Sequence, residues 1–126
     1  MTHSRLDTTI IRELGDAIHD ETGLMPHISS PQDSDSLPYI TIGRSGGLNV
    51  YDFKASLGIT VTVFDNDGYH AHDLANSVAD AVTEWYNTTR LSIMGKPLVD
   101  SILDEGDESG TYASSLQITV NYLERS

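Results

Sequence analysis

The segment LGITVTVFDNDGYHAHDLANSVADAV, residues 57–82, carries two kinds of hydrophobic periodicity in direct succession. In its first part apolar residues occupy every second position, which predicts a half-buried β-strand over residues 55–65. Over residues 68–87 the apolar positions follow helical spacing, which predicts an amphipathic helix packed on the sheet. A strand that leads directly into a covering helix indicates a fold that mixes the two kinds of element.

The segment VFDNDGYHAHDLA, residues 63–75, where the strand leads into the helix, contains three aspartates and two histidines, a composition that raises the question of a metal site. A calcium loop that began at the first of these aspartates would need a glutamate at its twelfth position, where the chain has Asn76. His70 and His72 lie about 200° apart around a helix, so both cannot bind one ion. The pattern instead predicts a structural corner in which Asp67 caps the helix, and no metal or other cofactor is expected.

Further elements are expected on both sides of this unit. In chain order they are a helix over 6–20 that ends at Gly23, a flexible proline-rich loop over 26–37, a strand that begins at Tyr39, the strand over 55–65, the helix over 68–87, a strand over 90–103 interrupted at MGKP, a polar hairpin loop over 104–110 and a strand over 111–123.

These elements predict a single α+β domain over residues 1–126. Its architecture is expected to be a two-layer sandwich in which two helices cover one face of a four-stranded antiparallel sheet. The order helix-strand-strand occurs twice, although no repeat is expected in the sequence itself.

The polar face of the predicted sheet is rich in β-forming residues. Thr60 and Thr62 lie on one strand, and Thr119 and Asn121 lie on another. Such a face suits either contact with water or pairing with another subunit, and the residues leave both possibilities open.

The segment RSGGLNVYDFK, residues 44–54, is predicted to be an interaction arm. Two glycines precede several apolar side chains, and apolar side chains in a loop of this length gain little until a partner covers them. The candidate interface residues of the arm are Arg44, Leu48, Val50, Tyr51 and Phe53.

The composition restricts the classes of function. Nineteen acidic residues stand against seven basic ones, for a formal net charge of −12, and this balance argues against binding nucleic acid. The chain has no cysteine, and it shows neither a signal peptide nor a membrane span. The acidity suits a host with a very salty cytoplasm, or it is a property of this protein alone.

The sequence contains no recognisable catalytic motif. No serine-hydrolase elbow, zinc-protease motif, Walker loop or dinucleotide fingerprint occurs. GRSGG, residues 43–47, is glycine-rich but leads towards a strand and lacks the helix N-terminus that binds phosphate in such loops. The protein is therefore expected not to be an enzyme.

Taken in order, these features resemble the tail terminator proteins of long-tailed phages and tailed archaeal viruses, the lambda-type family of minor tail proteins. The resemblance extends over nearly the whole chain. It is carried by SRLDTTIIRELGDAI as the opening helix, LPYITIG as the first strand, the arm over 44–54, LGITVTVFD leading into HAHDLANSVADAV, and the final YASSLQITVNYLE.

This resemblance implies a virion protein of the neck or tail that is assembled in the host cytoplasm, with a haloarchaeal host as one reading of the acidity. It implies a ring, usually a homo-hexamer, that stops polymerisation of the tail tube and joins it to the head-side connector. Its partners would be other copies of itself, the tail tube protein and the connector or stopper, while DNA would pass through without binding. The alternatives are a head-side neck or stopper protein and, from another class, an acidic cytoplasmic binding domain that mimics the charge of nucleic acid.

Overall fold

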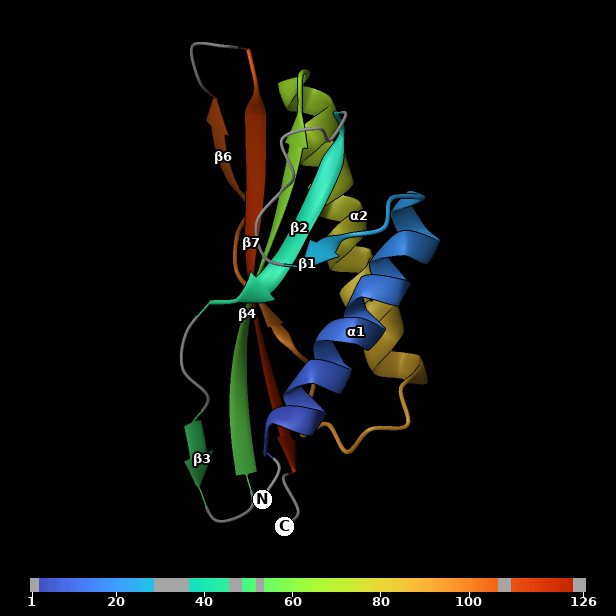
Figure 1. Cartoon of the computed structure of the whole chain (residues 1–126), viewed down its shortest axis with the longest axis vertical. Helices are drawn as coiled ribbons and strands as arrows, with labels where there is room; N and C mark the ends of the chain where they lie inside the picture. The colour runs from blue at the N-terminus through green and yellow to red at the C-terminus, as the bar shows by residue number, and fades with distance from the viewer. Residues whose placement is uncertain (1–2, 29–36, 46–48, 52–53, 107–109, 124–126) are drawn as a thin grey trace.

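The computed structural model describes residues 3–28, 37–45, 49–51, 54–106 and 110–123, which form two layers (Figure 1). Both helices lie on one face of a single sheet, as predicted. The elements are α1 (His3–Thr22), β1 (His27–Ile28), β2 (Tyr39–Arg44), β3 (Asn49–Tyr51), β4 (Lys54–Asp65), α2 (Gly68–Thr88), β5 (Leu98–Val99), β6 (Leu103–Gly106) and β7 (Tyr112–Leu123).

The sheet has more strands than the predicted four, and it is mixed. Within the described residues seven strands form one sheet in the order β1-β2-β4-β7-β5, with β3 beside β4 and β6 beside β7. The predicted all-antiparallel arrangement is wrong because β1 pairs with β2 in parallel. β1 lies in the predicted 26–37 loop, and β6 lies in the predicted 104–110 hairpin loop. Strands of two to four residues are too short for their periodicity to predict them.

The core lies between the central strands and the helices. β4 and β7 have twelve residues each and pair along their whole length. Each strand turns its alternate apolar side chains towards the helices, as their period of two predicts. Those that are fully or almost fully buried are Leu57, Ile59, Val61 and Val63 on β4, and Leu116, Ile118, Val120 and Tyr122 on β7.

The two central strands share a short sequence repeat, which corrects the expectation that no repeat exists. SLGITV occupies residues 56–61 of β4, and SLQITV occupies residues 115–120 of β7. Because the strands are antiparallel, the motif pairs with its own reverse, and Ile59 lies opposite Ile118. The strands are therefore related by a local twofold rotation about an axis through this isoleucine pair.

The same rotation relates the edges of the sheet. β2 and then β3 pair along the outer side of β4, while β5 and then β6 pair along the outer side of β7. β3 and β6 are therefore equivalent, since each forms a hairpin with the start of a long strand. Because β4 and β7 run in opposite directions, the two hairpins lie at opposite ends of the sheet (Figure 1).

Each edge is interrupted opposite its SLxITV motif. Asn49 is five positions after Arg44, although their partners on β4, Ser56 and Ile59, are only three positions apart. Leu103 is four positions after Val99, and their partners on β7 are three positions apart. The second edge has another interruption, because Leu98 is five positions after Ile93 while their partners on β7 are three positions apart. The predicted break at MGKP is thus confirmed, and the extra residues make the edge irregular as β-bulges do.

The helices also follow the predicted pattern. α2 begins after Asp67, whose carboxylate accepts hydrogen bonds from the backbone N–H groups of Tyr69 and His70. α1 ends before Gly23, whose positive φ of 79° allows its N–H to donate to the carbonyl of His19 at 2.8 Å. The predicted helix cap and helix stop are therefore both confirmed.

Candidate functional site

The first part of the predicted interaction arm is held by an ion pair. Arg44 is the last residue of β2, and its guanidinium pairs with the carboxylate of Asp7 on α1. The Asp7 side chain is fully buried, while that of Arg44 is 44% exposed. Because a buried carboxylate needs a charged or hydrogen-bonding partner, this pair fixes the point at which the chain leaves β2. Arg44 therefore has a structural role, whatever else it contacts.

The middle of the arm is a strand where a loop was expected. β3 pairs with the start of β4, so that Val50 lies opposite Ala55 and Tyr51 opposite Lys54. This pairing satisfies backbone groups within the chain, and the arm is therefore a hairpin that extends the sheet.

Leu48 and Phe53 lie outside the described residues, and so do the side chains of Val50 and Tyr51. The backbone nevertheless brings Arg44, Val50 and Tyr51 to one side of β4. That the arm contacts a partner remains a prediction.

The corner between β4 and α2 is held by hydrogen bonds, as its turn residues predict. Asp65 is almost completely buried, and its carboxylate accepts hydrogen bonds from the N–H groups of the next two residues at 2.7 and 3.3 Å. The same carboxylate contacts Nδ1 of His70. One aspartate therefore joins the strand end, the turn and the first turn of the helix.

The second histidine joins α2 to the edge of the sheet. His72 Nδ1 lies 2.8 Å from Oδ2 of Asp104 on β6, and Ser114 of β7 donates its hydroxyl hydrogen bond to Oδ1 of Asp104 at 2.6 Å. The hydrogen bond from Ser114 lowers the pKa of Asp104 below its usual range, with a further contribution from His72. The two histidines thus bind different aspartates, and within the described residues no group of three or more metal-binding side chains occurs.

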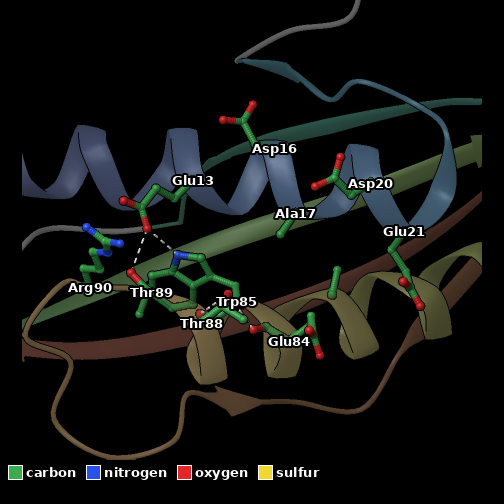
Figure 2. A pocket seen from close by; sticks show the side chains of 11 residues that line it. Glu13, Asp16, Ala17, Asp20, Glu21, Glu84, Trp85, Thr88, Thr89 and Arg90 are labelled. Atoms are coloured by element: carbon green, nitrogen blue, oxygen red, sulfur yellow. Dashed lines mark hydrogen bonds between the residues drawn. The ribbon is translucent and has the colours of Figure 1, made fainter.

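An acidic cleft lies between the two helices. Its volume is about 510 Å³, and it is lined by acidic side chains of both helices together with Trp85, Thr89 and Arg90. Figure 2 shows Glu13 of α1 at one end, where its Oε1 accepts hydrogen bonds from Trp85 Nε1 at 2.8 Å and Thr89 Oγ1 at 2.7 Å. Glu13 therefore connects α1 to the end of α2, while the remaining carboxylates face the cleft and solvent.

Exposed apolar side chains form the most distinctive surface feature. They gather at the two opposite edges of the sheet and at the end where α2 begins. At the β1 edge they are Met25, Ile28 and Leu37, at the β5–β6 edge they are Met94, Leu98, Val99 and Leu103, and near the start of α2 they are Tyr69 and Tyr112.

None of these edge residues is among the interface candidates that the sequence suggests. Leu98 and Val99 are adjacent, yet both are exposed, at 63% and 36%. In a regular strand one of two neighbouring residues faces the core, so the irregular pairing of this edge removes the alternation that would reveal it.

These features define a small α+β domain whose described surface is suited to contacts with other proteins. Within the described residues, neither helix combines the length and the apolarity needed to cross a membrane.

Comparison with known proteins supports the fold. Among solved structures, the chain is similar to one from the virion of native gene transfer agent (GTA) particle, with a TM-score of 0.59 and 14% sequence identity. The similarity covers 84% of each chain, so it extends through both helix-strand-strand units. No protein-family model matches the sequence, and no curated protein is a significant match. At this level of identity the likeness establishes a shared fold.

Proposed function

We propose that this protein is a structural component of a virion. The observation that carries the proposal is the likeness to a chain of a gene transfer agent virion over 84% of both chains. The exposed apolar side chains at the sheet edges support it, because apolar side chains that gather on a protein surface favour contact with other proteins. The role is structural and non-enzymatic, and the virion is where the protein resides.

More specifically, we propose a tail terminator. The protein forms a ring, a homo-hexamer in the family it resembles, at the head-proximal end of the tail tube, where it stops tube polymerisation and joins the tail to the head-side connector. The two hairpins lie at opposite ends of the sheet, and this position supports the role. A ring subunit must contact a neighbouring protein on each of two opposite sides. The arm over 44–54 belongs to one of these contacts.

The acidity is consistent with such a ring. With a net charge of −12, a lumen lined by this chain repels the phosphate backbone of DNA, so that DNA passes without binding. The same charge suits assembly in the salty cytoplasm of a haloarchaeal host.

The proposal is tested by electron microscopy of the purified protein in concentrated salt, with and without the tail tube protein. Closed rings with a central hole, and rings that cap tube ends, are the expected result. If the protein stays monomeric at high concentration and does not bind the tail tube, the terminator role is wrong. Virions that lack the protein should have overlong tails, whereas filled heads without tails would indicate a stopper instead.

The role of the arm has its own test. Replacing Tyr51 and Phe53 together by serine should weaken association with neighbouring subunits or the tube while leaving the circular dichroism spectrum unchanged. Loss of secondary structure in this variant would instead mean that the two aromatic side chains belong to the core.

The acidic binding domain remains the second candidate, and the charge balance is the observation that favours it. Such a domain would bind a basic, nucleic-acid-binding protein with an affinity that falls steeply with salt. Titration of a cationic DNA-binding protein at two salt concentrations separates this function from ring formation.

A further inference from the structure

The two exposed apolar edges cannot cover one another within one molecule. β1 forms one margin of the sheet and β5–β6 the other, with β2, β4 and β7 between them. At the β1 edge Ile28 is 68% exposed and Met25 is 53% exposed, and at the β5–β6 edge Leu98 is 63% exposed. Both edges therefore leave large apolar side chains uncovered within the molecule. Another molecule that packs on them would remove this apolar surface from water.

The β5–β6 edge contains a groove that can receive a side chain. The groove lies between α2 and β5, has a volume of about 320 Å³, and is lined on the edge side by Lys96, Pro97, Leu98 and Val99. Val82 of α2 is buried beside it. At the β1 edge, Ile28 and Met25 are large apolar side chains that are free to enter such a groove.

The two edges also differ in charge. The β5–β6 edge, residues 91–106, carries Asp100, Asp104 and Glu105 against one lysine. The β1 edge, taken as the described residues of 23–28 and 37–45, carries no acidic residue, and its one arginine, Arg44, is already paired with Asp7. The segment between them, 29–36, contains two aspartates and lies outside the described residues. In a chain of net charge −12, an edge whose described residues include no carboxylate can approach an acidic edge with little repulsion.

We infer that the β1 edge of one copy packs into the β5–β6 groove of the next copy. This contact joins two different surfaces, and contacts of that kind close into a ring when the rotation per subunit permits. The interrupted pairing of the β5–β6 edge makes it unsuited to simple sheet extension, so side chains rather than a backbone ladder form the contact. The inference rests on the proposed ring and specifies the surfaces that build it.

The test uses one charged substitution at each edge, Ile28→Asp and Leu98→Asp, with Tyr69→Asp as the matched control. Tyr69 is 88% exposed and lies at the start of α2, outside the β1 edge and outside the lining of the α2–β5 groove. Each edge variant should raise the concentration needed for assembly by roughly tenfold or more, as measured by light scattering during size-exclusion chromatography. The control should assemble as the unaltered protein does, and circular dichroism should show all three folded.

Mixing the two edge variants gives the decisive measurement. Each variant retains the edge that the other lacks, so an equimolar mixture should form dimers that contain one copy of each, and no rings, in native mass spectrometry. If one variant still self-associates while the other does not, the contact joins two identical surfaces, and the inference is wrong. The milder Ile28→Ser and Leu98→Ser variants replace any aspartate variant that fails to fold.

The failure of this inference can be told apart from the failure of the proposed function. If the unaltered protein forms rings and both edge variants still do so at the same concentration, the ring stands and these edges do not build it. If the unaltered protein forms no rings with or without the tube protein, the proposed function itself is wrong.

Discussion

The two halves of the molecule, α1 to β4 and α2 to β7, are built to one plan and differ mainly at their edges. In each half a helix is followed by an edge and then by a twelve-residue strand that carries SLxITV. The first edge consists of the regular strand β2, the short β1 outside it and the arm, whereas the second is broken into β5, β6 and an isolated bridge at Ile93. The buried centre thus follows one pattern in both halves, and the exposed margins are where they differ.

This difference indicates where function is located. Side chains at the centre are constrained by packing against the helices, and the buried positions of the shared motif carry the same residues in both strands, whereas Val63 is matched by Tyr122 beyond the motif. Residues at the edges are free of that constraint, and each edge has its own shape and charge. Contacts with partners therefore belong to the margins and hairpins of the sheet, while the central strands hold them in position.

The largest loss of stability is expected in the core, where it tests whether the central parts of β4 and β7 contribute equally to the free energy of unfolding. Ile59→Ala and Ile118→Ala remove equivalent side chains that face each other across β4 and β7, and both are essentially fully buried. Each should lower the free energy of unfolding by about 2–5 kcal/mol, as measured by urea denaturation. A loss at one position that is several times smaller than at the other would contradict the equivalence.

The next largest loss of stability is expected at the contact of Glu13 on α1 with the end of α2, which forms the joint between the halves. Glu13→Ala removes the acceptor of both Trp85 Nε1 and Thr89 Oγ1, and Trp85 is only 3% exposed. Leaving these donors without a partner should cost about 1–3 kcal/mol of stability. Trp85 is the only tryptophan, so its fluorescence reports the joint during thermal unfolding. Asp16→Ala, an exposed position on the same helix, is the control and should have little effect.

A smaller effect is expected where the shared motif differs between the halves. The motif has Gly58 in β4 and Gln117 in β7. A Cβ atom at Gly58 would lie 2.6 Å from Oγ of Ser45, the residue that follows β2. Gly58→Ala should therefore displace Ser45 and cost about 1 kcal/mol, while Gln117→Ala, at an exposed position, should be nearly neutral.

A double-mutant cycle checks the cause of that loss. Combining Gly58→Ala with Ser45→Gly should recover most of the stability, because the hydroxyl that meets the new methyl group is gone. Denaturation curves that show simple additivity of the two changes would place the cause elsewhere.

The smallest effect is expected at Asp104, the carboxylate on β6 at the edge of the second half. Ser114→Ala removes the main hydrogen bond that lowers the pKa of Asp104, so this pKa should rise towards its ordinary value of 3.8, as followed by NMR titration. Because the folded-state pKa is lowered, the stabilisation is complete above the unfolded-state value and is lost as the pH falls through the folded-state value. The difference in stability between the two proteins should therefore shrink in acid. An unchanged pKa would mean that His72 is the dominant partner of Asp104.

The sequence predicts the long elements well because their patterns are long. β4, β7 and both helices each extend over twelve or more residues, and their apolar positions repeat often enough to identify the buried face. The cap at Asp67 and the stop at Gly23 follow from local backbone chemistry, which a sequence displays directly. The SLxITV repeat was also readable, by direct comparison of the two strands.

The short elements and the surface could not be predicted in the same way. β1 and β5 have two residues each, and their position depends on pairing with distant parts of the chain. The exposed residues Ile28 and Leu98 resemble core residues in the sequence, and only the position of their strands at the sheet margins shows that they face outwards. The arm is conspicuous in the sequence for its glycines and apolar residues, but its pairing with β4 depends on a register that the sequence does not display.

The scarcity of lysine has a practical consequence for mapping the assembly. The chain contains only Lys54, at the turn from β3 into β4, and Lys96, in the lining of the α2–β5 groove. Amine-reactive reagents can therefore label only these two side chains and the chain terminus. Cross-linking followed by mass spectrometry would thus give a short, easily assigned set of peptides, each of which reports on the arm hairpin or on the groove.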